Sequence, residues 1–176
     1  MKTLVVTETG KLEIREIPIP EIDDRQALVK MVCCGICNGT DAKLIHRSFK
    51  GFPEEVYPLL LGHEAVGRVV ETGSAVTKYK KGDIVLLPFV DADRELYGEL
   101  NSGWGGYSEY GVIHDEGAYP EGEAPECAYA QTIVPEYVDP VDSTMIITLR
   151  EVLSSIKRFG IKKGDRVAVF GCGPVG

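Results

Sequence analysis

Three residues in the first half of the chain have side chains that can bind a metal ion. They are Cys37 and the adjacent pair His63 and Glu64. Zinc accepts Cys sulfur, His nitrogen and carboxylate oxygen, and a catalytic zinc keeps one position open for water or substrate. The spacing alone leaves two interpretations open. A lone Cys often packs as a small apolar side chain, and a lone His often lies hydrogen-bonded in the core.

The end of the chain carries a second chemical signal, a glycine-rich turn. Residues 166–170 predict a buried strand, and the glycines that follow complete the pattern G-x-G-x-x-G. This pattern marks the turn at which a dinucleotide-binding unit begins. The candidate cofactor-binding residues are Gly171, Gly173, Pro174, Val175 and Gly176. The helix and the acidic ribose anchor of such a unit would come after residue 176, so we expect one domain of a two-domain enzyme.

The elements that must position these residues are mostly short strands. Apolar stretches closed by Gly or Pro predict strands at about 2–6, 12–17, 27–33, 66–73, 83–88 and 104–113. Strands at this spacing are typical of a barrel-like all-β core, so the predicted fold class is mainly β, with a few helices. The segment from Asp115 to Cys127, rich in Glu, Gly and Pro, predicts a surface loop.

The period of the apolar pattern changes near the end of the chain. Apolar residues fall on one helical stripe, namely Leu149, Val152, Leu153, Ile156 and Phe159. Thr148 and Glu151 have the spacing of a capping box, and Gly160 is well placed to end the helix. We therefore predict a helix over 148–159.

Composition excludes several classes of function. The net charge of −8 argues against nucleic-acid binding, and the largest basic cluster, residues 78–81, is typical of a solvated turn. The sequence shows neither a signal peptide nor a membrane-spanning run. Five cysteines, an odd number, indicate reduced thiols or metal ligands rather than disulfides, and a cytoplasmic location is expected.

Several short motifs together resemble one enzyme family. They are Gly35-Ile36-Cys37, Gly62-His63-Glu64, Lys81-Gly82-Asp83, Gly105-Gly106-Tyr107 and the terminal glycine turn. In this order they resemble the zinc-dependent, medium-chain alcohol dehydrogenases. The resemblance implies a catalytic domain like the chaperonin cofactor GroES, a partly open β-barrel, over residues 1–147. Residues 148–176 would hold a connecting helix and the first strand of a Rossmann domain.

The resemblance also implies roles for individual residues. Cys37 matches the first catalytic zinc ligand and His63 the second, and Glu64 matches an acidic neighbour that binds zinc or lies just behind it. Asp41 matches the carboxylate that orients the ligating His. An alternative role for Asp41 is to cap the short helix that follows it.

The chain departs from the family pattern at three places. Relatives usually have Ser or Thr two residues after the Cys ligand, to contact the alcohol, whereas this chain has Gly39 there and Thr40 one position later. Lys43 replaces a relay His of many relatives, with His46 one turn further on. The four-cysteine lobe of a structural zinc is absent, so one zinc is expected. Where relatives carry their last ligand, this chain has Ile147.

These observations predict a function for the longer enzyme. It would oxidise an alcohol or polyol, or reduce a carbonyl compound, with NAD or NADP, and zinc would polarise the substrate oxygen. Without a nucleotide domain the chain itself is expected to be inactive, and to form a homo-oligomer or self-associate through the exposed strand 166–170. Two alternatives stay open: a zinc-independent, quinone-reductase-like enzyme, and a GroES-like oligomeric structural module.

Overall fold

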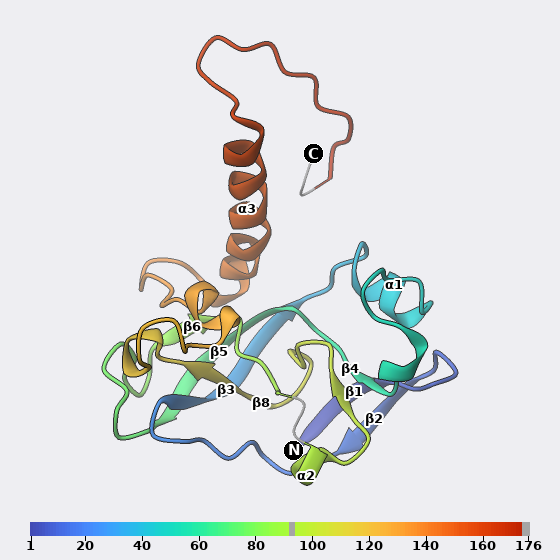
Figure 1. The fold of residues 1–176 in the computed structure, drawn as a ribbon, viewed down its shortest axis with the longest axis vertical. Coiled ribbons are helices and arrows are strands. Elements are labelled where there is room, and N and C mark those ends of the chain that lie inside the picture. Colours follow the sequence, from blue (N-terminus) through green and yellow to red (C-terminus); the bar gives the residue numbers. More distant parts are fainter. Residues whose placement is uncertain (92–93, 174–176) are drawn as a thin grey trace.

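The described residues form two four-stranded sheets, with a long helix that projects from them (Figure 1). The computed structural model describes residues 1–91 and 94–173. The first sheet has the order β2–β1–β4–β7, with bounds β1 Lys2–Val6, β2 Leu12–Glu16, β4 Leu59–Leu60 and β7 Asn101–Ser102. The second has the order β6–β5–β3–β8, with bounds β3 Gln26–Gly35, β5 Glu64–Thr72, β6 Ile84–Leu86 and β8 Tyr110–His114.

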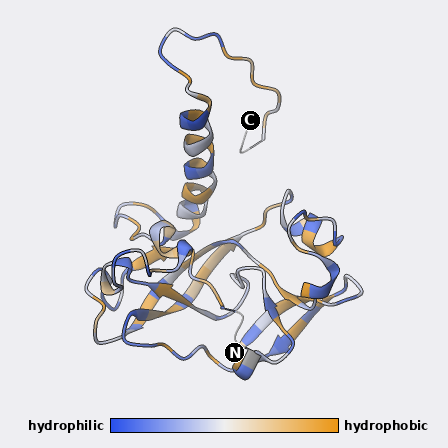
Figure 2. Ribbon diagram, in the orientation of Figure 1, coloured by the Kyte–Doolittle hydropathy of each residue, from blue (hydrophilic) through white to orange (hydrophobic). Residues whose placement is uncertain are grey.

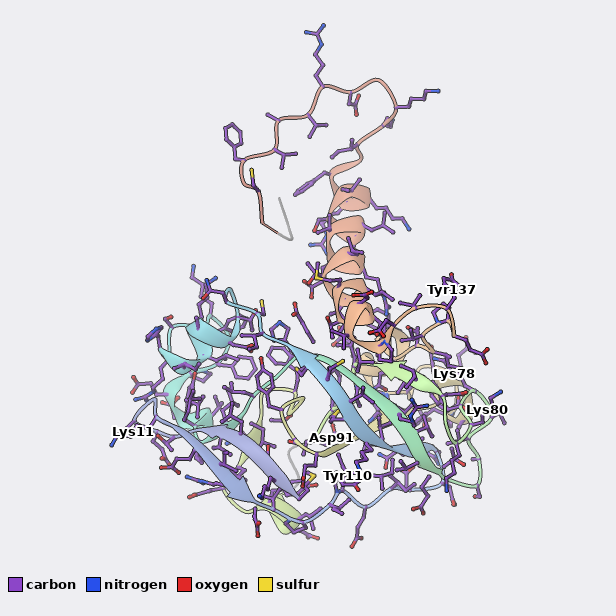
Figure 3. All side chains as sticks on the ribbon, turned by 180° about the vertical axis from the view of Figure 1, so that it is seen from behind. Lys11, Lys78, Lys80, Asp91, Tyr110 and Tyr137 are labelled. Atoms are coloured by element: carbon purple, nitrogen blue, oxygen red, sulfur yellow. The ribbon has the colours of Figure 1, made fainter. Side chains whose placement is uncertain are left out.

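The two sheets lie side by side and form the β body of the molecule. The second sheet is antiparallel throughout, whereas β4 and β7 of the first sheet pair in parallel. From behind, Lys11 marks the end of the body formed by the first sheet, and Lys78, Lys80 and Tyr137 mark the end formed by the second (Figure 3). The predicted mainly β class with few helices is confirmed.

The pairing of β3 with β5 brings the two metal-binding motifs together. The ladder runs antiparallel and ends with Gly35 opposite Glu64. Because the end of β3 lies beside the start of β5, Cys37, just beyond one strand, comes close to His63, just before the other. The sheet register therefore places residues that are far apart in sequence at one edge.

Apolar side chains on both sheets form the core beneath this edge. One buried cluster consists of Val6, Leu44, Tyr57, Leu59 and Leu61, with Trp104 and Tyr107 packed against it. A second, of Val66, Leu86 and Val134, is contacted by Ile146 from the long helix. The site edge is thus supported from below by the sheets and from above by the helix.

The remaining elements near the body are short helices: α1 Asp41–Ile45, α2 Arg94–Tyr97, and the 3-10 helices η1 Glu54–Val56, η2 Glu116–Ala118 and η3 Glu126–Ala130. The predicted loop between Asp115 and Cys127 contains η2 and the start of η3. The predicted strand at 104–113 begins only at Tyr110, because Trp104 and Gly105 have positive φ values of 75° and 74° and a turn follows them at residues 106–107. No helix of the described residues combines the length and apolar character needed to cross a bilayer.

The long helix α3 spans Pro140–Phe159, so its predicted start at Thr148 is wrong. Asp139 is the N-cap, where its carboxylate accepts a 2.8 Å hydrogen bond from the backbone N–H of Val141. Pro140 fits the first helical position because it lacks an N–H that would go unpaired there. The helix ends at Gly160 as predicted, in the left-handed conformation at φ 68°.

The segment after α3 forms no strand at 166–170, which differs from the prediction. Val167, Val169 and Phe170 are 54%, 67% and 97% exposed, and no described strand lies beside them. An apolar run becomes a strand only where a partner supplies its hydrogen bonds. The predicted self-association through this segment stays a prediction.

Apolar side chains are also exposed along α3, where orange and blue bands alternate (Figure 2). They include Val141, Leu149, Leu153 and Phe159. The first half of the helix lies against the β body, and the second half extends beyond it (Figure 1). The domain boundary predicted at 147/148 falls inside this helix and stays a prediction.

Candidate metal centre

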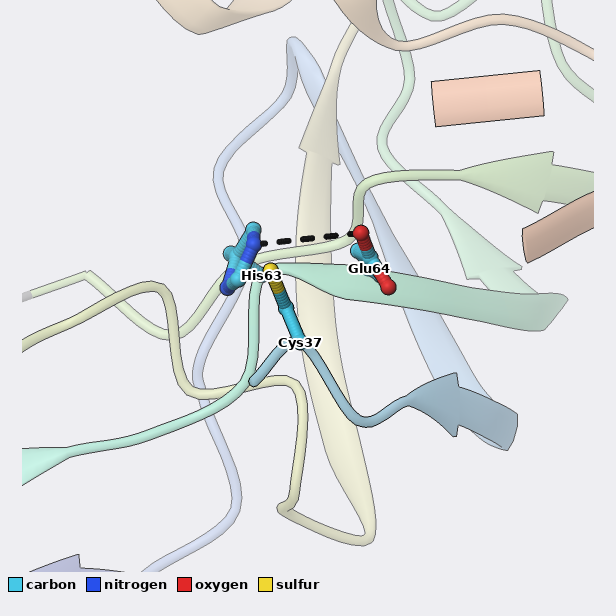
Figure 4. A group of neighbouring side chains, drawn as sticks. All are labelled: Cys37, His63 and Glu64. Carbon is cyan, nitrogen blue, oxygen red and sulfur yellow. Dashed lines mark ion pairs between the residues drawn. The ribbon is translucent and has the colours of Figure 1, made fainter. Parts of the chain in front are cut away.

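Cys37, His63 and Glu64 converge at the edge formed by β3 and β5 (Figure 4). One ligand atom from each lies within 4.8 Å of the others, and this is the one group of its kind found in the described part of the chain. The Nε2 atom of His63 is 4.0 Å from Oε1 of Glu64. All three residues are partly buried, so the donor atoms are accessible and still positioned by their surroundings.

A glycine immediately before His63 allows this arrangement. Gly62 has a φ of 101°, and a Cβ added there would lie 2.6 Å from the backbone nitrogen of Tyr107. The carbonyl oxygen of Gly62 also accepts a 2.7 Å hydrogen bond from Gly106 N–H. Only glycine fits this close approach of two backbone segments. The conformation turns the chain so that His63 faces Cys37.

Asp41 lies behind His63 and connects the site to the sheet. Its Oδ2 accepts a 3.0 Å hydrogen bond from Cys37 N–H and lies 2.7 Å from the Tyr107 hydroxyl. Its Oδ1 is 3.4 Å from Nδ1 of His63, and neither atom has a well-directed hydrogen bond to any described group. The carboxylate faces these partners rather than the N–H groups of α1, which favours the orienting role over the capping role.

Both partners of this contact have shifted pKa values. Burial raises the pKa of the Asp41 carboxyl, but the adjacent His63 imidazole and the hydrogen bonds from Tyr107 and Cys37 outweigh it, so the net shift is downward. Burial lowers the pKa of His63, yet the nearby Asp41 carboxylate and Cys37 outweigh it and raise the pKa overall. Each shift has the direction expected when a carboxylate stabilises an imidazole beside it.

The other residues singled out near Cys37 lie at the margins of the site. Thr40 is the N-cap residue of α1, half-buried, and its hydroxyl makes no capping hydrogen bond. Lys43 and His46 are exposed. Thr40 is therefore the one of the three that stays a candidate for contact with a substrate oxygen.

A cavity of about 770 Å³ opens between the site and α3. Near the metal-binding residues its wall contains His63 and Trp104, whose ring centroids are 5.2 Å apart. Ile147 and Arg150 of α3 line it from above. Ile147 is 95% buried and has a hydrocarbon side chain, so α3 supplies no metal ligand from this position. The cavity gives a small molecule access to His63.

Two residues at the site were not found from the sequence. Tyr107 contacts Asp41, and Thr148 of α3 donates a 2.9 Å hydrogen bond to Oε1 of Glu64. The spacing of Thr148 from Glu151 instead predicts a capping residue. Its contact with Glu64 joins residues 84 positions apart, which no local sequence pattern signals.

The remaining cysteines and the cofactor-binding candidates lie outside this group. Cys34 is a neighbour of the site, and burial, with help from nearby carboxylates, raises the pKa of its thiol to about 12, so it is protonated. Gly171 and Gly173 are exposed in the segment after α3. Pro174, Val175 and Gly176 lie outside the described residues.

Comparison with protein families identifies the class to which this fold and site belong. Residues 23–123 match the family model of the alcohol dehydrogenase GroES-like domain. The chain therefore belongs to the alcohol dehydrogenase family, of which it contains the GroES-like catalytic domain.

Individual relatives agree with this assignment. An uncharacterized zinc-type alcohol dehydrogenase-like protein of Bacillus subtilis is 31% identical over the whole chain and 50% of its own length. The crystal structure of 2R,3R-butanediol dehydrogenase from Bacillus subtilis superposes with a TM-score of 0.70 at 25% identity, covering 99% of this chain and 52% of that one. A Sinorhizobium meliloti protein described as a zinc-binding dehydrogenase, solved with NADP bound, superposes with a TM-score of 0.64 at 27% identity. The match covers 89% of this chain and 45% of that one. The chain spans about half the length of the curated relatives it matches.

Proposed function

We propose that this chain forms the zinc-binding, substrate-activating part of an NAD(P)-dependent alcohol or polyol dehydrogenase. The observation that carries the proposal is the convergence of Cys37, His63 and Glu64, together with the cavity that His63 lines. Relatives named as zinc-type alcohol dehydrogenase or butanediol dehydrogenase support the same reaction class. The nicotinamide cofactor is proposed for the longer protein, by analogy with the relative solved with NADP.

The residues present fit a zinc ion in their chemistry and their environment. Sulfur, imidazole nitrogen and carboxylate oxygen are all zinc ligands, and three protein ligands with one open position are typical of a catalytic site. The buried Nδ1 of His63 faces Oδ1 of Asp41 with no other partner. A carboxylate beside the far nitrogen of a ligating His is the usual support for a zinc site.

The protein's own groups prepare the site for this chemistry. Asp41 favours the His63 tautomer with its proton on Nδ1, which leaves the Nε2 lone pair facing Cys37 and Glu64. Trp104 and Ile147 line the cavity with apolar surface, which limits the water around a bound substrate. Zinc, when bound, supplies Lewis acidity that lowers the pKa of an alcohol group. Thr40 is proposed to contact the substrate hydroxyl.

Elemental analysis of the purified chain tests the proposal and separates it from a zinc-independent reductase. After expression in zinc-supplemented medium, we expect about one zinc per chain in the wild type and loss of that zinc in Cys37→Ala. Cys172→Ala, at an exposed cysteine far along the chain, serves as the matched control and should keep its zinc. Less than about 0.1 zinc per chain, unchanged in Cys37→Ala, contradicts the proposal.

A further inference from the structure

Glu64 is held from two sides by residues that are not themselves candidate metal ligands. On one side the Thr148 hydroxyl donates a 2.9 Å hydrogen bond to Oε1. Thr148 is 94% buried, and the Glu64 side chain is only 16% exposed, so water competes little for this bond. A hydrogen bond to a carboxylate in such surroundings is among the stronger kinds.

On the other side the carboxylate occupies space left by a missing side chain. Oε2 of Glu64 lies 2.5 Å from the point where a Cβ of residue 35 would be, and Cβ of Glu64 lies 3.2 Å from it. Gly35 is the direct cross-strand neighbour of Glu64 at the end of the β3–β5 ladder. With glycine at 35, the carboxylate lies against the strand instead of turning into solvent.

The hydroxyl of Thr148 is itself fixed in position by the packing of α3. Its neighbour Ile147 is buried, and Ser143, one turn earlier, is fully buried. Ile146 packs against the core cluster of the second sheet. A threonine side chain has few allowed χ1 rotamers in a helix, so a fixed helix gives a fixed hydroxyl.

We propose that Thr148 is a positioning residue of the metal centre, and that with Gly35 it holds the Glu64 carboxylate toward Cys37 and His63 as the third protein ligand. This inference rests on the proposed function, because it assumes that the site binds zinc. Helix α3 then contributes to the site through a hydroxyl group rather than through a ligand of its own. Because Glu64 then serves as the third protein ligand, the site does not need a ligand from Ile147, whose side chain is a hydrocarbon.

Zinc affinity of the full chain, measured by competition with a chromophoric chelator, tests this role. Thr148→Val removes the hydroxyl at nearly constant volume and should weaken zinc binding by about 10-fold or more, the size of effect typical of an outer support of a ligand. Thr148→Ser keeps the hydroxyl and should stay within about 3-fold of the wild type. Thr144→Val is the matched control, since the Thr144 hydroxyl bonds within α3 to the Val141 carbonyl, and its affinity should not change.

Gly35→Ala provides an independent variant that acts on the other oxygen. A Cβ at position 35 must displace Oε2, so zinc affinity should fall in the same direction as for Thr148→Val. Thermal unfolding in the presence of a chelator shows whether each variant is folded. If Thr148→Val does not fold, Gly35→Ala decides the question.

The possible outcomes distinguish the two proposals. Wild-type affinity in both Thr148→Val and Gly35→Ala overturns the positioning role and leaves the proposed function standing. Equal weakening in Thr144→Val also overturns it, because the effect then belongs to the helix as a whole. A wild-type chain that binds no zinc overturns the proposed function and this inference together.

Discussion

Two groups of buried polar side chains differ in how their hydrogen bonds are satisfied. Asp115, 99% buried after β8, accepts hydrogen bonds from the backbone N–H groups of Thr77, Lys78 and Gly117 at 2.7, 2.8 and 3.0 Å. In the candidate metal centre, by contrast, some buried polar atoms have no hydrogen-bond partner. Oδ1 of Asp41 and Nδ1 of His63 are buried without a directed partner.

Gln131 continues the first pattern. It is fully buried, its Oε1 accepts a 2.8 Å hydrogen bond from His114 N–H, and its Nε2 donates a 2.9 Å bond to the Leu87 carbonyl. Its own carbonyl oxygen accepts from the Tyr79 hydroxyl at 2.7 Å. A buried polar group paired with backbone contributes to folding, whereas two ionisable groups that face only one another, with perturbed pKa values, are typical of a functional site.

The first prediction concerns the satisfied group and has the largest expected effect. Asp115→Ala removes a buried carboxylate that accepts hydrogen bonds from three partly buried backbone N–H groups and should lower the free energy of unfolding by about 3 kcal/mol at neutral pH. Denaturant unfolding measures the change. The control Asp165→Ala, at an exposed carboxylate, should change the value by less than about 0.5 kcal/mol.

The difference in free energy of unfolding between wild type and Asp115→Ala depends on pH in a way that follows from the pKa of Asp115. Burial raises this pKa, but the backbone hydrogen bonds outweigh burial and lower it overall. A carboxyl with a lowered folded-state pKa stabilises the protein above its unfolded value of about 3.9 and loses that contribution as the pH falls through the folded value. The gap between wild type and Asp115→Ala should therefore narrow on acidification. A gap that widened would contradict this account of Asp115.

A second prediction concerns the incomplete group. Asp41→Asn keeps the size of the side chain but removes the charge that supports His63, so zinc affinity should fall by about 10- to 100-fold. Asp115→Asn is the matched control and should leave zinc affinity unchanged while it lowers stability. If both variants changed zinc affinity equally, the distinction between the two groups would be lost.

Much of the fold was predictable because Gly and Pro mark the ends of the strands. Most of the longer strands and the end of α3 at Gly160 follow from such local signals. The predicted start of α3 is wrong although Asp139 and Pro140 form a good N-terminal signal. Thr148 and Glu151, later in the same helix, have the spacing of a capping box and so resemble a helix start. At residues 166–170 the local signal predicts a strand that does not form, because a strand also needs a neighbouring strand to pair with.

The residues of the candidate site also fall into a group that the sequence predicts and a group that it does not. Cys37, His63 and Glu64 lie in short motifs, and the structure brings them together. Thr148 lies in no metal-binding motif, and the motif that contains Tyr107 gives no sign of what its hydroxyl contacts. Their contacts with Glu64 and Asp41 depend on how distant elements pack. Sequence thus indicated the groups that could bind a ligand, and only the folded structure showed what holds them in place.

The absorption spectrum of the chain loaded with cobalt(II) tests the central claim most directly. Cobalt accepts the same sulfur, nitrogen and oxygen ligands as zinc, and its visible bands report on the geometry of the site. We predict intense visible bands typical of four-coordinate cobalt, with a near-ultraviolet charge-transfer band from thiolate that disappears in Cys37→Ser. A weak spectrum typical of six-coordinate cobalt, identical in the wild type and Cys37→Ser, would contradict a metal centre built on Cys37, His63 and Glu64.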